Sequence, residues 1–172
     1  MDCHTAYLGL GSNLGDRFGY FCCAVAGLNS KAQGEVSGSS SVYETQPVDM
    51  DSRNRFLNAA VRFDTRLSPE ELLACIHDIE NEFGRERVPG AGYLDRTIDI
   101  DLLAYDDLVI RGTQLTVPHP KMHERLFVMV PMSELAGGFV HPVLRKTMIE
   151  IRSSLPAGEL KIWKEANWHA QK

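Results

Sequence analysis

The sequence predicts a single α+β domain in which helices pack on a mainly antiparallel sheet. Extended apolar runs alternate with helical patterns along the chain, and several of the runs follow one another as hairpins. The chain has 172 residues, of which 44% are hydrophobic, so it can bury one core. Hairpin-connected strands between helices are typical of a split βαβ unit, which predicts a ferredoxin-like core.

The first third of the chain predicts three strands and one helix. A strand covers residues 6–10, and a helix begins at residue 16 and ends near residue 28, with its apolar residues on one face. The Gly- and Ser-rich residues 34–41 are expected to form a turn before a strand at residues 42–43. Residues 56–63 show the alternating pattern of a strand, with further apolar residues between the alternating positions. They predict the third strand of this part of the chain.

Residues 68–83 carry the clearest helix signal. Ser68 is a suitable N-cap, Pro69 fits the first helical position, and Glu71 completes a capping box. Gly84 is suited to end the helix. The expected buried stripe consists of Leu72, Ile76, Ile79 and Phe83.

The second half of the chain predicts two more strands and two more helices. The strands are expected at residues 97–105 and 115–117, and the helices at residues 123–135 and 143–155.

The chain shows no repeat, low-complexity tract or linker that would divide it. We therefore expect one domain over residues 1–160. Residues 161–172 have little periodicity and are expected to form a peripheral C-terminal tail.

Charge and composition argue against several classes of protein. The net charge of −5 repels phosphate backbones, which disfavours a general nucleic-acid binder. No apolar run approaches the roughly 18 residues that span a membrane, and the first residues lack the pattern of a signal peptide. Four scattered cysteines match neither a disulfide framework nor a C-x-x-C metal site, so reduced thiols and a cytoplasmic location are expected.

Two aspartates in the strand at 97–105 are the most informative residues. Because side chains alternate along a strand, Asp99 and Asp101 point to one face and Ile100 to the other. Two residues span about 6.5–7 Å, so both carboxylates can share a cation or a pair of cations. A hard cation such as Mg²⁺ would relieve their repulsion. The alternative is an amphipathic edge strand whose polar face is acidic.

Arginines flank the aspartate pair on both sides in the sequence. Arg85, Arg87 and Arg96 precede it and Arg125 follows it. Guanidinium groups match phosphate oxygens, and metal ions with arginines are the usual apparatus of phosphoryl transfer. The pattern predicts a Mg²⁺-dependent enzyme that transfers a phosphoryl-type group from ATP.

Other catalytic motifs are absent from the sequence. The glycine-rich residues 9–15 match neither a P-loop nor a full G-x-G-x-x-G, and a tight turn between strand and helix explains their glycines. The histidines lack zinc spacing, and no nucleophile signature occurs.

Several motifs in one order resemble the 6-hydroxymethyl-7,8-dihydropterin pyrophosphokinases, a family of folate-biosynthesis enzymes. The resemblance extends over residues 6–152. The matching motifs are LGLGSNLGDR (8–17), YETQPV (43–48), FLNAAV (56–61), GRER (84–87), DRTIDIDLL (95–103), VPHPKMHERLFV (117–128) and the HP at 141–142.

This resemblance implies a ferredoxin-like enzyme that moves the β,γ-pyrophosphate of ATP to the pterin hydroxymethyl oxygen and releases AMP. It implies two Mg²⁺ ions on Asp99 and Asp101, and ATP and 6-hydroxymethyl-7,8-dihydropterin as small-molecule substrates. The residues that match the pterin pocket are Thr45, Gln46, Pro47, Val48, Phe56, Asn58, Phe127 and, as a loop aromatic, Tyr93. Those that match the ATP side are His77, Glu80, Arg85, Arg87, Arg96, Ile100, Thr116, His119 and Arg125. Arg85, Arg96, Asp99 and Asp101 are the expected catalytic residues, and the protein is expected to be a monomer.

The loops depart from the family pattern. Tyr93-Leu94-Asp95-Arg96 stands where many relatives have Trp-x-Pro-Arg, so Asp95 replaces a rigid proline with a negative charge. Residues 88–92 lack an arginine that some members have, Gln46 replaces a proline and Asp49 a glycine. The loops at 47–55 and 88–95 are the candidates for closure over the substrates.

Two other functions stay open at the level of sequence. A metal-dependent phosphohydrolase on the same scaffold would use the aspartates and arginines but leave Asn58 and Phe127 unexplained. A catalytically silent pterin- or nucleotide-binding module would gain little from two exposed carboxylates.

Overall fold

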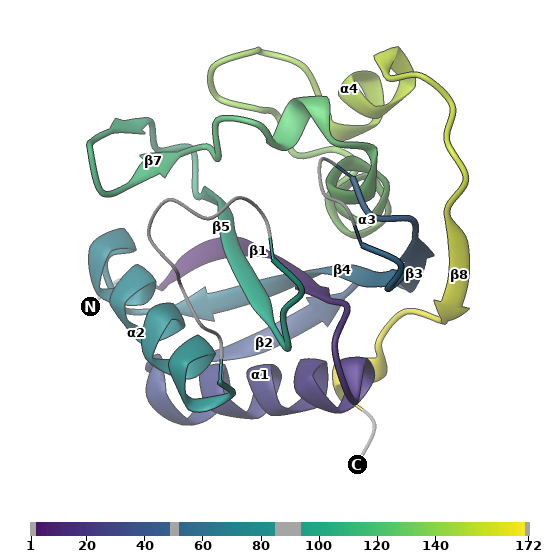
Figure 1. Ribbon diagram of the computed structural model, residues 1–172. Helices are drawn as coiled ribbons and strands as arrows, with labels where there is room; N and C mark the ends of the chain where they lie inside the picture. Colours follow the sequence, from purple (N-terminus) through teal and green to yellow (C-terminus); the bar gives the residue numbers. More distant parts are fainter. Residues whose placement is uncertain (1–2, 49–51, 85–93, 171–172) are drawn as a thin grey trace.

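The computed structural model describes residues 3–48, 52–84 and 94–170 (Figure 1). The expected catalytic and binding residues Arg85, Arg87 and Tyr93, and most of the loop at 88–95, lie outside this part of the chain. The same holds for Asp49 in the loop at 47–55.

One antiparallel sheet forms the centre of the molecule. Its strands lie in the order β5-β1-β4-β3-β8, and β2 also pairs with β4. The strands are β1 (His4–Ser12), β2 (Gly34–Ser39), β3 (Val42–Thr45), β4 (Phe56–Thr65), β5 (Asp99–Tyr105) and β8 (Lys161–Lys164). A separate hairpin consists of β6 (Ile110–Arg111) and β7 (Thr116–Val117).

The order of the strands confirms the predicted ferredoxin-like core. Strand β4 lies between β1 and β2, and β1 lies between β4 and β5. Each helical connection, β1-α1-β2 and β4-α2-β5, therefore passes over an inserted strand, which defines two split βαβ units.

Helices cover the two faces of the sheet unequally (Figure 1). The helices α1 (Arg17–Lys31) and α2 (Pro69–Glu82) pack on one face and bury the larger core. On the other face α3 (Leu126–Ala136) and α4 (Met148–Ser154) cover part of the sheet with a smaller, methionine-rich core. Two 3₁₀ turns, η1 (Met122–Glu124) and η2 (Trp168–Ala170), complete the described elements.

The capping residues place the two large helices as predicted. Asp16 caps α1 by accepting a hydrogen bond from the Gly19 N–H, and Ser68 and Glu71 form the capping box of α2. Among the described residues, no helix is both long enough and apolar enough to cross a bilayer.

The structure differs from the prediction at residues 34–41, where a strand replaces the expected turn. Only Val36 gives this stretch an apolar side chain in the core, so its alternation is too weak to read from the sequence. A side-chain Cβ at Gly34 would lie 2.2 Å from the Asp64 carbonyl oxygen. Glycine here permits the close pairing of β2 with β4.

The two late helices are shorter than predicted or broken. Within the expected helix at 123–135, a 3₁₀ turn precedes α3. In the second, a turn with Arg145 at φ 56° occupies the first residues, and α4 begins only at Met148, after its N-cap Thr147, which forms a capping box with Glu150.

The expectation of a peripheral tail at 161–172 is wrong for most of that segment. Strand β8 pairs with β3 and extends the sheet. Trp168 is 2% exposed, packs against Phe18 and Phe21, and donates from Nε1 to the Ser40 carbonyl at 3.0 Å. Isolated aromatic residues have no period, which is why the sequence pattern missed them.

Trp168→Ala should therefore lower the free energy of unfolding by about 3–5 kcal/mol, because it empties a filled part of the core. Trp163→Ala is the matched control, since Trp163 is 47% exposed. It should cost about 1 kcal/mol or less. Chemical denaturation measures both, and equal losses would contradict the assignment of Trp168 to the core.

Candidate active site

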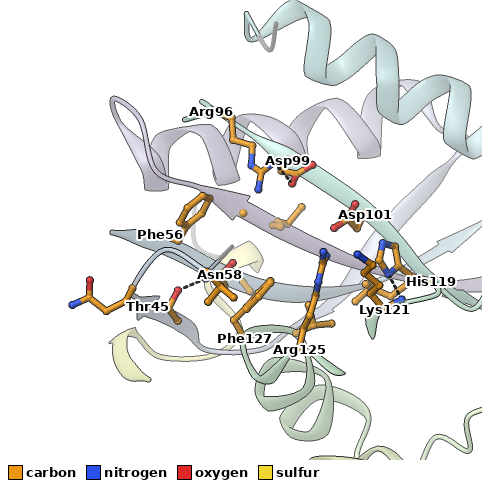
Figure 2. A pocket seen from close by; sticks show the side chains of 18 of the residues that line it. Thr45, Phe56, Asn58, Arg96, Asp99, Asp101, His119, Lys121, Arg125 and Phe127 are labelled. Carbon is orange, nitrogen blue, oxygen red and sulfur yellow. Dashed lines mark hydrogen bonds and ion pairs between the residues drawn. The ribbon is translucent and has the colours of Figure 1, made fainter. Parts of the chain in front are cut away.

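A cavity of about 340 Å³ opens on the sheet face that α3 leaves partly uncovered. Side chains from β4 and β5 reach it from the sheet, and side chains from the segment before α3 and from its first turn face them (Figure 2). The expected residues on its wall are Thr45, Gln46, Val48, Phe56, Asn58, Arg96, Asp99, Asp101, His119, Arg125 and Phe127. Pro47 is half-buried and is not part of this wall.

The register of β1 with its neighbours creates the floor of the cavity. Gly11 pairs with Asn58 on one side and with Asp99 on the other. Residues paired in this way share a face, and two strand spacings put the outer pair about 10 Å apart. Because Gly11 has no side chain, the space between the amide and the carboxylate stays open. A Cβ there would lie 3.5 Å from Asn58 Oδ1 and 3.8 Å from Asp99 Cβ.

Two residues away along β1, on the same face of the sheet, Gly9 lies between Ala60 and Asp101. The sequence interpretation of these glycines as residues of the turn between strand and helix is therefore wrong for Gly11, which lies within β1, whereas Gly9 lies within the strand predicted at residues 6–10. Gly15, at φ 68°, does belong to the turn before α1.

The acidic end of the cavity carries Asp99 and Asp101, both directed toward it from β5 (Figure 2). Arg96 Nη1 lies 3.2 Å from Asp99 Oδ2, and its guanidinium lies 5.4 Å from the centre of the Phe56 ring. Within the described ranges, no group of three or more His, Cys, Asp and Glu side chains could hold a metal. Two carboxylates fit Mg²⁺, which commonly binds one or two of them together with waters and substrate phosphates.

The other end of the cavity is aromatic and amide-lined. Asn58, 6% exposed, donates from Nδ2 to Thr45 Oγ1 at 2.8 Å, which turns its Oδ1 toward Gly11. Phe56 and Phe127 come from β4 and from the first turn of α3, and both border the cavity (Figure 2). This end suits a flat ring with polar edges.

A second cavity of about 310 Å³ runs along β5, which is an edge strand. Its wall contains the expected residues His77, Ile100, Thr116 and His119. It shares Asp101, His119 and Pro120 with the first cavity, so the two spaces meet beside one of the paired aspartates.

Glu80 lies outside both walls. It is fully buried, and its carboxylate accepts a hydrogen bond from the Ile100 N–H at 2.8 Å. This contact ties α2 to the edge strand, so Glu80 shapes the second cavity through β5.

Lys121 lines the first cavity, although the sequence analysis did not select it. In the sequence, Lys121 lies between the candidate residues His119 and Arg125. A positive charge only two residues after a candidate histidine is the signal that could have identified it. Its backbone N–H donates to His119 Nδ1 at 3.2 Å.

The surroundings of His119 favour its neutral form. Burial lowers its pKa, and the positive charge of Arg125 lowers it further, while Asp99 acts in the opposite direction. With Nδ1 accepting from the Lys121 N–H, the ring proton belongs on Nε2. His119 can thus donate a hydrogen bond at the junction of the cavities.

Residues 7–137 match the sequence model of a family described as 7,8-dihydro-6-hydroxymethylpterin-pyrophosphokinase. The chain belongs to this family. It is 48% identical over 132 residues to the 2-amino-4-hydroxy-6-hydroxymethyldihydropteridine pyrophosphokinase of Bacillus subtilis, covering 77% of this chain and 78% of that protein. Similarity to the Dictyostelium discoideum folic acid synthesis protein FOL1 is 38% over 155 residues, which is 90% of this chain and 23% of the larger one.

Solved structures resemble the fold. The wild-type Plasmodium falciparum HPPK-DHPS with pteroate has a TM-score of 0.70 at 15% identity, over 88% of this chain and 44% of that one. At this identity the similarity concerns the fold alone. This chain spans less than half of that longer chain, as it does of the Dictyostelium relative.

The pKa of His119 should rise in Arg125→Ala, because removal of a nearby positive charge makes protonation easier. Proton NMR titration of the imidazole resonances measures this shift. Arg66→Ala, at an exposed position after the far end of β4, is the control and should leave the pKa unchanged. A titration that does not move in Arg125→Ala would contradict the electrostatic account of His119.

Proposed function

We propose that the chain transfers pyrophosphate from ATP to the hydroxymethyl group of 6-hydroxymethyl-7,8-dihydropterin and releases AMP, a step of folate biosynthesis. One observation carries this proposal. In a chain of this family, an aromatic and amide-lined cavity and a second cavity along an edge strand meet beside Asp101. Two substrates that exchange a group need such a junction.

The first cavity is suited to the pterin. Phe56 and Phe127 offer aromatic faces for stacking on a flat ring, and Asn58 offers an oxygen acceptor in the plane of its edge. With the ring edge at Asn58, the hydroxymethyl group reaches across Gly11 toward Asp99. Thr45, Gln46 and Val48 complete the wall, and Pro47 contributes through the course of the backbone.

The second cavity is suited to the nucleoside of ATP. Ile100 and the half-buried Thr116 border it, so the nucleoside would lie along the edge strand β5. His77 lies at the α2 side of the same space. A triphosphate chain that leaves this cavity then passes His119 and Asp101.

Positive groups surround the expected path of the phosphates. Arg96, Lys121 and Arg125 line the first cavity, and the neutral His119 can donate from Nε2. Such donors stabilise charge that develops on a transferred phosphoryl group. From the sequence, Arg85 and Arg87 are expected to add to this set.

Asp99 and Asp101 would hold Mg²⁺, and the family resemblance suggests two ions. Bound there, the metal would neutralise phosphate charge and lower the pKa of the attacking hydroxyl. Asp99 faces Asn58 across Gly11, and Asp101 lies one register pair further along β5, opposite Gly9 and Ala60. A monomeric state and a cytoplasmic location stay predictions from the sequence.

The test of this proposal is to incubate the purified protein with Mg-ATP and 6-hydroxymethyl-7,8-dihydropterin and to separate the nucleotides by chromatography. AMP should form only when pterin and Mg²⁺ are both present. ADP, or hydrolysis without pterin, would point to a phosphohydrolase. Binding of both ligands without turnover would point to a silent binding module.

The variants Asp99→Asn and Asp101→Asn should each reduce AMP formation at least about 100-fold, because a neutral amide would hold the Mg²⁺ that neutralises the phosphates much more weakly. Asp107→Asn is the control, since Asp107 is exposed on the turn after β5. Circular dichroism should show folded protein in all three. Activity within a factor of two of the wild type in Asp101→Asn would contradict the role of the pair.

Gly11→Ala should separate stability from function. The added methyl makes only ordinary contacts, and alanine in a strand is about 0.5–1 kcal/mol more favourable than glycine, so the protein should stay folded. Because the methyl occupies the cavity floor, the pterin should bind at least about 10-fold more weakly in calorimetry. Gly138→Ala, where the new Cβ meets no atom within 4 Å, is the control. Unchanged pterin affinity in Gly11→Ala would contradict the proposed path across the floor.

A further inference from the structure

The carboxylate of Asp95 connects two segments that are distant in the sequence. Its Oδ1 accepts a hydrogen bond from Asn13 Nδ2 at 2.6 Å, and its Oδ2 accepts one from Asn54 Nδ2 at 2.6 Å. Asn13 belongs to the turn between β1 and α1, and Asn54 to the connection between β3 and β4. One side chain thus links the turn before α1 with the connection that leads into β4.

On the first side, Asn13 holds the backbone of Arg96. The Arg96 N–H donates to Asn13 Oδ1 at 2.8 Å, and the Asn13 N–H donates to the Arg96 carbonyl at 3.1 Å. Asn13 is 3% exposed, so its amide nitrogen needs a protein acceptor, which Asp95 supplies. Asp95 therefore supports the residue that places the Arg96 guanidinium next to Asp99.

On the second side, Asn54 lies two residues before Phe56, a wall of the pterin cavity. Ser52 Oγ accepts from the Asn54 N–H at 3.1 Å, and a hydrogen bond from Ser52 is the largest cause of the lowered pKa of Asp95. The Arg55 carbonyl accepts from Arg17 Nη1 at 2.9 Å. The described end of this loop is therefore fixed to the body of the protein just before Phe56.

We propose that Asp95 is a positioning residue that holds the Phe56 wall against Arg96 and Asp99 before the pterin arrives. The Arg96 guanidinium lies over the Phe56 ring, so the two ends of the Asp95 bridge meet again inside the cavity. A wall that is already in place need not be ordered on binding, which strengthens binding without a direct contact. A proline at this position, as the family resemblance implies for many relatives, could not accept either hydrogen bond. This inference rests on the proposed function for the identity of the ligand.

The test compares Asp95→Ala, Asn54→Ala and the double variant by calorimetry with the pterin, at saturating Mg²⁺ and α,β-methylene-ATP. Each single variant should bind the pterin about 3- to 10-fold more weakly. In Asn54→Ala, which leaves the contacts of Asn13 with Asp95 and Arg96 intact, the affinity for the nucleotide alone should change less than about 2-fold. The double variant should be no weaker than the singles, because both remove the same bridge. Asp107→Ala is the matched control and should bind as the wild type does.

Hydrogen exchange of the ligand-free proteins gives a second readout that does not depend on the function. Amides at residues 52–58 should exchange faster in Asp95→Ala and Asn54→Ala than in Asp107→Ala. Equal losses of pterin and nucleotide affinity in Asn54→Ala, or full additivity in the double variant, would overturn the positioning role. If the wild type binds no pterin, the proposed function fails, and unchanged exchange at 52–58 would then overturn the bridge itself.

Discussion

The antiparallel pairing of β1 between β4 and β5 is the constraint on which the site depends. It sets Gly11 between Asn58 and Asp99, and Gly9 between Ala60 and Asp101. A fixed register assigns every side chain to a face, so a shift by one residue would turn both aspartates into the core that α1 and α2 cover. The site is therefore a property of the sheet, and the lack of a side chain at Gly9 and Gly11 is as important to it as the polar groups of β4 and β5.

The position of β5 at the edge of the sheet gives the site its second half. An edge strand has one unpaired side, and here α2 and the segment around Thr116 border a cavity along it. The buried Glu80 accepts from the Ile100 N–H and so fixes the edge at the point where the cavity lies. As a result, Asp101 lies on the walls of both cavities. A group can therefore pass from a ligand in one cavity to a ligand in the other while both ligands stay bound.

Sequence alone predicted the parts of this arrangement that rest on local rules. The capping box predicted the start of α2, and the alternation of Asp99 and Asp101 predicted their shared face, while their role as a metal pair stays a prediction. What depends on long-range pairing was not accessible: Gly11 resembles a turn residue until its partners are known. The Gly/Ser-rich β2 and the buried Trp168 were missed for the same reason, because pairing and packing partners decide both. The residues named from the motif resemblance lie on the walls of the two cavities, apart from Glu80, Pro47 and the residues outside the described ranges.

The most direct measurement for the central claim is a crystal structure of the protein with Mg²⁺, α,β-methylene-ATP and 6-hydroxymethyl-7,8-dihydropterin. The account predicts the pterin between Phe56 and Phe127 with its hydroxymethyl group above Gly11. It predicts the adenine beside Ile100, and the phosphates passing Asp101 and His119 from one cavity to the other. A nucleotide bound away from the edge of β5, or a pterin on the far side of Asp101, would contradict the claim that the two cavities form one active site.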